Sequence, residues 1–132
     1  MEEFDSSPLV RTDFSNDAAW DSLIAVASNR SPDGFQALLR VVEDSACEGV
    51  RPEHLVGQDW QNASILFVAD AEAQSHSEQP ILCVDLIENP GRSFRCVPAE
   101  LWGVENNLRL GNMDFEEFAE ATDPDGIFRG FR

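Results

Sequence analysis

The feature that most constrains this chain is a set of short apolar runs between Ser64 and Val97. Three runs rich in valine, isoleucine, leucine and phenylalanine, each bounded by turn-forming residues, cover residues 64–70, 81–87 and 93–97. Runs of this length and composition are typical of β-strands. The polar segment 71–80 is expected to be a loop, whereas Pro90 and Gly91 favour a tight turn. We therefore predict three strands, of which the last two form an antiparallel hairpin.

The predicted hairpin carries apolar residues on both of its faces. With the proline and the glycine at the centre of the turn, Asp85 pairs with Cys96, and Ile87 pairs with Phe94. One face then presents Ile81, Cys83, Asp85, Ile87, Phe94 and Cys96, and the other presents Leu82, Val84, Leu86, Arg95 and Val97. Strands that are apolar on both sides need cover on both sides, so helices are expected on both faces. The expected fold is α/β or α+β, with a single mixed sheet of about four or five strands around a central antiparallel hairpin.

Asp85 is a carboxylate within an otherwise apolar strand. A buried charge is costly unless it is paired, so we predict a structural ion pair with an arginine. Arg92, Arg95 and Arg11 are the candidate partners, and of these Arg95 and Arg11 are favoured. A functional carboxylate is the alternative interpretation.

The segments before the hairpin alternate between strand and helix signals. Residues 8–13 indicate a short strand, and residues 16–28 carry apolar side chains at helical spacing, with Ser15 as the predicted N-cap. Residues 35–43 fit either a helix or a strand, and the topology favours a strand. Residues 52–58 begin with a proline, which a first helical turn tolerates, so a short helix is predicted there.

The segments after the hairpin are predicted to be mainly helical. One helix begins at Pro98 and ends at Gly111, and a second begins after Asp114, which has capping-box spacing to Glu117. The apolar residues of segment 127–132 indicate that the C-terminus docks on the domain.

The length and charge of the chain limit its organisation and its partners. A chain of 132 residues is expected to form one globular domain over residues 8–132, preceded by a flexible acidic tail over residues 1–7. The net charge is −16, from 25 acids and nine basic residues, all of which are arginine. So negative a chain is repelled by nucleic acid and by anionic membranes, but it suits a basic protein partner. The sequence does not indicate an oligomeric state.

Cysteine usage and hydropathy point to a cytoplasmic protein. The three cysteines, Cys47, Cys83 and Cys96, lack metal-ligand spacing, and the last two share a face only diagonally, which is poor geometry for a disulfide. We interpret them as small buried residues in a reducing compartment. No apolar run approaches the ~18 residues of a membrane span, and no secretory segment is recognised.

Three aspartates at or near strand ends, Asp13, Asp70 and Asp85, are candidate ligand residues. Ligands commonly bind at the carboxyl ends of parallel strands, and carboxylates suit Mg²⁺ or Ca²⁺. However, Asp85 lies within its predicted strand, so its offset from the other two is about 7–10 Å at ~3.3 Å per residue. A divalent ion holds its oxygens at ~2.0–2.6 Å. We therefore predict no metal site, no cofactor is indicated, and the alternative roles of Asp13 and Asp70 are to cap a helix and a turn.

Two further groups of residues are candidates for ligand or partner contacts. Asn106 and Asn107 are adjacent on a predicted helix, where one is expected to point outward and the other to bond to the backbone. A cleft shared by such an asparagine and Arg129 is the best alternative for a small ligand. The second group is a ridge of acids without a basic residue: Asp114, Glu116, Glu117, Glu120, Asp123 and Asp125.

Four motifs give the chain a family resemblance. They are Arg-Thr-Asp-Phe-Ser at residues 11–15, Glu-Asn-Asn-Leu at 105–108, Gly-Asn-Met-Asp-Phe-Glu-Glu-Phe at 111–118 and Asp-Gly-Ile-Phe-Arg-Gly-Phe at 125–131. Together they resemble a family of short, acidic actinobacterial proteins that is described only as a domain of unknown function. The resemblance implies a stand-alone cytoplasmic domain, and it carries over no catalytic residues.

Two classes of function follow from these observations. The first is a non-enzymatic acidic interaction module that binds a basic protein surface, for example in an immunity or toxin-neutralising role. The second is a small enzyme or ligand-binding domain that uses the carboxylates at the strand ends. The charge, the small size and the lack of a catalytic motif favour the first, and the chain is not expected to be an enzyme.

Overall fold

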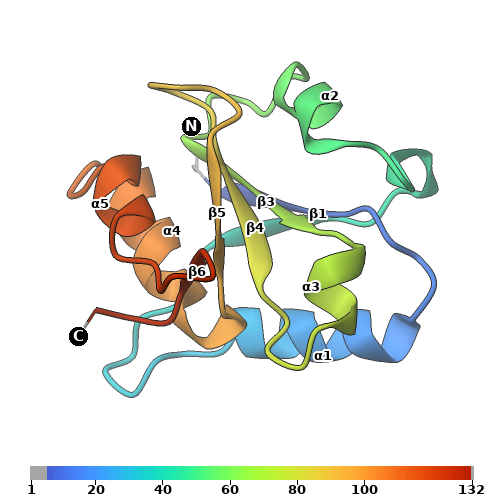
Figure 1. Cartoon of the computed structure of the whole chain (residues 1–132), viewed down its shortest axis with the longest axis horizontal. Coiled ribbons are helices and arrows are strands. Elements are labelled where there is room, and N and C mark those ends of the chain that lie inside the picture. Colours follow the sequence, from blue (N-terminus) through green and yellow to red (C-terminus); the bar gives the residue numbers. More distant parts are fainter. Residues whose placement is uncertain (1–5, 132) are drawn as a thin grey trace.

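The apolar runs of the sequence become neighbouring strands of one sheet. The computed structural model describes residues 6–131. Its strands are β1 (Ser7–Arg11), β2 (Leu39–Val42), β3 (Ile65–Ala69), β4 (Ile81–Asp85), β5 (Ser93–Cys96) and β6 (Ile127–Phe128). They lie in the order β2-β1-β3-β4-β5-β6 (Figure 1). The described chain thus has six strands rather than four or five, because the docked C-terminal segment itself extends the sheet.

Strand directions in the sheet are mixed, as predicted. β1 runs parallel to both β2 and β3, β4 is antiparallel to both β3 and β5, and β6 is parallel to β5. Parallel neighbours require crossover connections. α1 (Asp17–Ala27) connects β1 to β2, a segment containing α2 (Pro52–Val56) leads from β2 to β3 on the other side of β1, and residues 97–126 connect β5 to β6.

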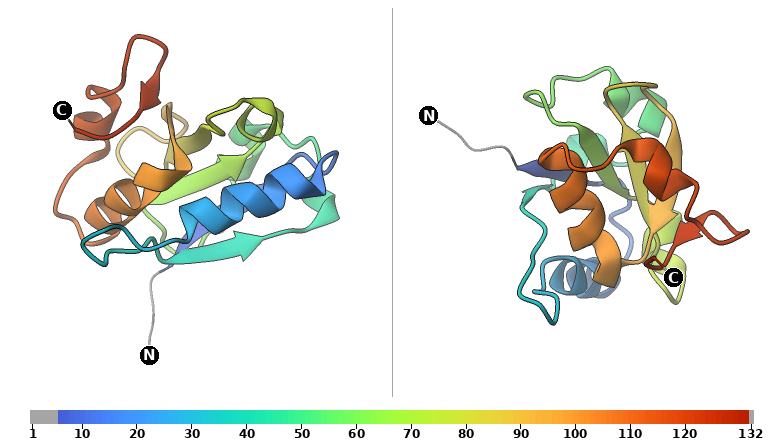
Figure 2. Two further views of the ribbon diagram at one scale, coloured as in Figure 1. Left: turned by 90° about the horizontal axis from the view of Figure 1, so that it is seen from below. Right: turned by 90° about the vertical axis from the view of Figure 1, so that its left-hand side faces the viewer.

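Helices cover both faces of the sheet (Figure 2). On one face lie α1, α3 (Ala71–Ser75), α4 (Leu101–Arg109) and α5 (Phe115–Ala119), all of which pack on the cluster around Phe67 and Cys83. On the other face lie α2 and the 3-10 helix η1 (Ser45–Cys47), which pack on the cluster around Leu66 and Val84. Burying each large apolar side chain contributes about 1.5–3 kcal/mol, so these two clusters hold the helices on the sheet.

The hairpin has a different register from the predicted one, but its faces are as predicted. Cys83 pairs with Phe94, and Ile81 pairs with Cys96, so the pairing is shifted by four residues. An even shift leaves every side chain on its original face. Ile87, which was expected in the strand, lies in the connecting loop and is 60% exposed.

The cysteines of the hairpin follow from this register. Cys83 and Cys96 share a face diagonally, and both are buried and free, as predicted, whereas Cys47 is free but only half-buried. Burial raises the pKa of the Cys96 thiol well above its ordinary value.

Several local expectations also differ from the structure. Asn16 rather than Ser15 caps α1, because its side chain accepts a hydrogen bond from Ala19 N at 3.0 Å. The predicted loop 71–80 begins with α3. Residues 39–42 of the ambiguous segment are strand β2, as the topology favoured. Of the predicted tail, residues 1–5 lie outside the described part of the chain.

The domain starts earlier, and the helix after β5 starts differently, than the sequence predicted. Ser7 was assigned to the tail, but it is buried as the first residue of β1. The helix predicted from Pro98 begins with the 3-10 helix η2 (Pro98–Glu100), which α4 continues directly. Among the described residues, no helix has the length and apolar character needed to cross a bilayer.

Candidate functional site

The candidate site begins with Asp85, the residue that ends β4. Asp85 is 2% exposed, and its carboxylate accepts hydrogen bonds from the backbone N–H groups of Ile87 (2.9 Å) and Asn89 (3.0 Å). The guanidinium of Arg92 reaches the same carboxylate at 3.3 Å. These bonds fold the chain into a loop directly after Asp85, which explains why the strand ends before Ile87.

The predicted burial and arginine pairing of Asp85 are therefore confirmed, but the favoured partners are wrong. Arg95 binds Asp70, and Arg11 binds Asp17 and Glu43. Both arginines emerge at the other end of the sheet from Asp85, because β4 runs antiparallel to β3. Arg92, in the loop after β4, is the arginine that reaches Asp85.

A hollow of about 160 Å³ opens beside this loop. We call it the loop–helix hollow; it is lined by Ser64, Asp85, Ile87, Glu88, Leu108, Met113, Asp114 and Phe115. These residues come from the position before β3, the end of β4 and the loop after it, the end of α4, and the start of α5 with the two residues before it. Each charged residue of the lining is an acid, and the other lining residues are apolar except for one serine.

Arg92 shows how a cation is held next to this hollow. Its guanidinium contacts the carboxylates of Asp85 and Glu116 and lies over the ring of Phe115, with Cζ 4.8 Å from the ring centroid. Burial opposes the charge of Arg92, but the hydrogen bonds with Glu116 and Asp85 outweigh it and raise the pKa of Arg92. This end of the molecule is therefore chemically suited to a guanidinium group.

The acidic segment 114–125 is divided into two groups instead of forming the expected single ridge. The helix ends at Ala119, so the two aspartates beyond it pair with Arg129, while Glu116 pairs with Arg92. A helix of five residues cannot align acids that are spread over about three turns.

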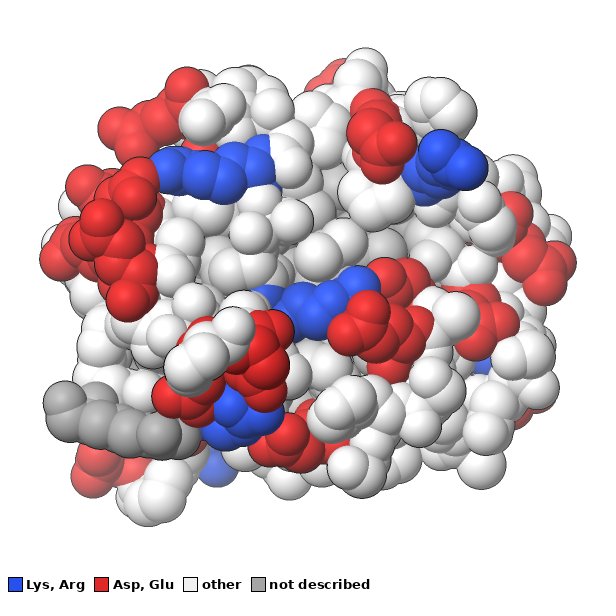
Figure 3. Space-filling view, viewed as in Figure 1, with Lys and Arg blue, Asp and Glu red and all other residues white. Residues whose placement is uncertain are grey.

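Four exposed acids of the β4–β5 loop and of α5 with its caps have no arginine partner within the described chain: Glu88, Asp114, Glu117 and Glu120. Asp114 and Glu117 form the predicted capping box, in which each side chain accepts from the other's backbone N–H at 3.2 and 3.1 Å. Figure 3 shows acidic side chains gathered over α5, at the left of the view. The field around the hollow is therefore negative.

The aspartates predicted at strand ends do not converge on one site. Asp13 and Asp70 follow the carboxyl ends of β1 and β3, whereas Asp85 lies at the opposite end of the strands and ends β4 instead of lying within it. Asp70 caps α3 and binds Arg95 through two bonds of 3.0 and 2.7 Å. Asp13 accepts from Ser15 N and holds the turn before α1. Among the residues described, no three Asp, Glu, His or Cys side chains are grouped as metal ligands.

Asn106 and Asn107 both bond within the fold. Asn107 donates to the carbonyl of Gly103, one turn back, at 2.8 Å, and Asn106 donates to the carbonyl of Gln36 at 3.0 Å. One asparagine thus reaches back to its own helix, as expected, but the other joins α4 to the segment before β2.

Their neighbour Glu105 is a buried residue that the sequence reasoning missed. Glu105 is 0% exposed, and its carboxylate accepts from Ser7 Oγ (2.7 Å), Leu38 N (2.8 Å) and Arg109 Nε (2.7 Å). The signal was its position, because Glu105 lies on the same helical stripe as Leu101 and therefore faces the core. Its bonds tie α4 to β1 and to the entry of β2.

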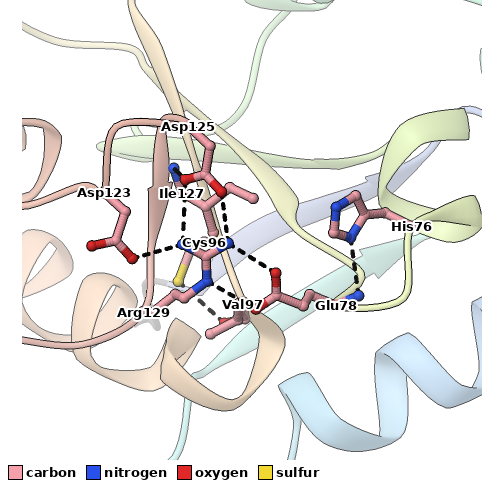
Figure 4. A network of polar contacts seen from close by, with 8 residues as sticks. All are labelled: His76, Glu78, Cys96, Val97, Asp123, Asp125, Ile127 and Arg129. Carbon is pink, nitrogen blue, oxygen red and sulfur yellow. Dashed lines mark hydrogen bonds and ion pairs between the residues drawn. The ribbon is translucent and has the colours of Figure 1, made fainter.

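Arg129 lies among three carboxylates (Figure 4). It binds Glu78 at 2.8 Å, Asp123 at 2.6 Å and Asp125 at 2.7 Å. Hydrogen bonds with Glu78, Asp125 and Asp123 raise the pKa of Arg129, and the same bonds lower the pKa of Glu78 and of Asp125. Arg129 borders a second hollow of about 390 Å³, but neither asparagine lines it, so the predicted cleft of asparagine and arginine is not formed.

The four sequence motifs lie within one region of family similarity. Residues 6–131 match a family described as a domain of unknown function, DUF6924. The chain belongs to the DUF6924 family. The predicted resemblance is thereby confirmed at the level of a domain of unknown function. No curated protein matches the chain.

The DUF6924 region contains both the loop–helix hollow and the Arg129 cluster. Of the residues that line the hollow, sequence reasoning named Asp85 and Asp114 as candidates. It missed Glu88 and Met113, which lie in a turn and between two helices, where periodicity carries no information. The sequence shows that one of these residues is charged and the other apolar, but only the fold brings them together.

Proposed function

We propose that this chain is a non-enzymatic interaction module that binds a basic surface of another protein. Neutralisation of a basic toxin is one example of such a role. The observation that carries the proposal is that the fold uses its arginines internally, whereas most of its acids remain exposed. Arginines in ion pairs are Arg11, Arg92, Arg95, Arg109 and Arg129. Of the arginines in the described chain, only Arg30 and Arg51 are exposed.

This arrangement leaves a surface on which negative charge dominates. The net charge of −16 creates a field that attracts cations over a distance of about one Debye length, ~8 Å at physiological salt. Complementary charge raises the rate of encounter and suppresses acidic partners. The partner is therefore a protein with a basic surface, and nucleic acid and anionic membranes are excluded by repulsion.

The second candidate function, a small enzyme or ligand-binding domain, has less support. Asp13 is engaged in a turn and Asp70 in an ion pair, and Asp85 lies at the opposite end of the strands. Arg129 is also surrounded by carboxylates, so it has no vacant direction for an anionic ligand.

Salt dependence tests the proposal. A partner captured at low salt should be basic, and its dissociation constant with the purified chain, measured by calorimetry, should rise steadily with sodium chloride. At about 1 M salt the Debye length is ~3 Å, so binding should be largely lost. A tight partner whose affinity is the same at low salt and at about 1 M would contradict the proposal, as would an acidic partner.

A pair of matched variants tests which surface is used. Glu120→Gln removes one exposed charge beside α5, and Glu53→Gln removes one from α2 on the other face of the sheet. We expect the first to weaken partner binding about two- to fivefold, the usual strength of an exposed ion pair, and the second to leave it unchanged. Equal effects would contradict a binding surface centred on α5.

A further inference from the structure

We propose that the loop–helix hollow is the anchor site for one arginine side chain of the basic partner. This inference rests on the proposed function and adds to it the occupant of a specific place. Interfaces depend on a few residues that fill pockets, and arginine is enriched among them. The hollow lies within the acidic end of the molecule, so its charge complements such an occupant.

The size of the hollow suits a guanidinium group. Its volume is about 160 Å³. A protein cavity of about 150 Å³ accommodates benzene, which is larger than a guanidinium group. The hollow is also partly open to solvent, so a side chain that belongs to another protein can enter it.

The lining offers both of the contacts that an arginine side chain needs. Leu108, Met113 and Phe115 provide apolar surface for the methylene stem. At the rim, Glu88 makes no hydrogen bond or ion pair within the described chain, and Asp114 uses only Oδ1, for the capping box. These two carboxylates therefore have oxygens available for the N–H groups of a guanidinium.

Asp85 supplies a third, buried acceptor. It receives bonds from Ile87 N, Asn89 N and Arg92, whereas a carboxylate has about four lone-pair positions. One position therefore remains. Because Asp85 is 2% exposed, an incoming donor would meet it away from bulk water, where a charge-assisted hydrogen bond is strong.

Arginine fits this site better than a metal ion or lysine does. The apolar lining repels a hydrated metal ion, and the described chain has no group of three suitable ligands. A lysine ammonium is compact and strongly hydrated, whereas a guanidinium is weakly hydrated and stacks on aromatic rings. Arg92 already packs in this way on Phe115, which lines the hollow.

The test is a titration followed by NMR, with N-acetyl-arginine amide as the probe and N-acetyl-citrulline amide as its neutral counterpart. We expect the arginine probe to shift the backbone signals of Ile87, Met113 and Phe115, and the citrulline probe to leave them unchanged. Glu88→Gln should weaken the arginine probe roughly threefold, as expected for the loss of one rim charge. Glu53→Gln, an equal loss of charge on α2, should not affect it.

Each other outcome contradicts the assignment. It is overturned if the arginine probe shifts no signal of the hollow, if citrulline binds equally well, or if Glu53→Gln weakens binding as much as Glu88→Gln. Stronger binding of N-acetyl-lysine amide would overturn the choice of arginine. If a partner binds in a salt-sensitive manner without shifting the NMR signals of the residues that line the hollow, the anchor site alone is overturned and the proposed function stands.

Discussion

Arg11 is 1% exposed, and each of its three guanidinium nitrogens donates a hydrogen bond within the fold. Its Nε donates to the carbonyl of Asp13 at 2.8 Å, and its terminal nitrogens reach Asp17 at 2.8 Å and Glu43 at 3.0 Å. The planar group also lies over the ring of Trp20. A buried charge that is fully matched costs little net free energy, but removing one of its partners leaves an uncompensated charge. The same reasoning applies to Asp85.

At the residue scale, we expect Asp85→Ala to destabilise the protein by about 2–3 kcal/mol. The variant removes two backbone caps and leaves Arg92 with one carboxylate instead of two. The cost is below the ~3–5 kcal/mol of a fully buried pair because the Arg92 side chain is 26% exposed. Urea unfolding measures the change. A loss of less than about 0.5 kcal/mol would show that the loop does not depend on this carboxylate.

The C-terminal strand β6 is a short element that side chains hold in place. Its backbone carbonyl at Phe128 accepts a bond from Val97 N at 3.2 Å, and the ring of Phe128 packs edge-on against Phe118 at 5.3 Å. Arg129 follows directly and joins the strand to Glu78 in the segment before β4. Isolated edge strands of this length are weak, so these side-chain contacts determine whether β6 stays paired.

At the element scale, we expect Arg129→Met to reduce the dependence of stability on acidic pH. The folded pKa values of Glu78 and Asp125 are lowered by Arg129. Carboxylates of this kind add stability above their unfolded pKa of about 4, and they lose it as the pH falls through their folded pKa. Wild type should therefore lose more unfolding free energy below about pH 4 than the variant, as measured by urea unfolding at a series of pH values.

The control for this prediction is Arg51→Met, since Arg51 is exposed and forms no ion pair in the described chain. Its pH profile should run parallel to that of wild type. If the Arg129→Met profile also runs parallel to wild type, the arginine does not lower the pKa values of Glu78 and Asp125.

The whole molecule carries far more negative than positive charge. Self-repulsion of this kind destabilises a compact state, and added salt screens it. The carboxylates are spread over both ends of the strands and over α5, and in the part of the chain that is described they form no cluster of metal ligands. General screening and specific metal binding therefore predict different responses to divalent cations.

At this scale, we expect Mg²⁺ or Ca²⁺ to raise the thermal midpoint no more than sodium chloride of equal ionic strength does. The physical reason is that Asp13 and Asp70 are hydrogen-bonded within the fold and Asp85 lies at the opposite end of the strands. Thermal unfolding with each salt measures this. A saturable rise at micromolar metal, abolished by Asp13→Asn or Asp70→Asn, would instead favour the ligand-binding alternative.

Local chemistry was sufficient to predict most elements and their faces. The capping box at Asp114, the helical spacing in α1 and the two apolar faces of the hairpin depend on residues within one or two turns of each other. Such short-range patterns are readable because capping, periodicity and strand alternation act between near neighbours. The hairpin faces were correct despite a wrong register because the shift was even.

The register, the ion-pair partners and the hollow depend instead on how the chain packs in three dimensions. The register depends on the side chain of Asp85, which folds the chain back before Ile87. Which arginine meets which carboxylate depends on strand order, since β4 runs antiparallel to β3 and carries Asp85 away from Arg95. The loop–helix hollow joins segments from Ser64 to Phe115. No local pattern encodes such contacts, because they arise from how the sheet orders its strands and how the helices pack across it.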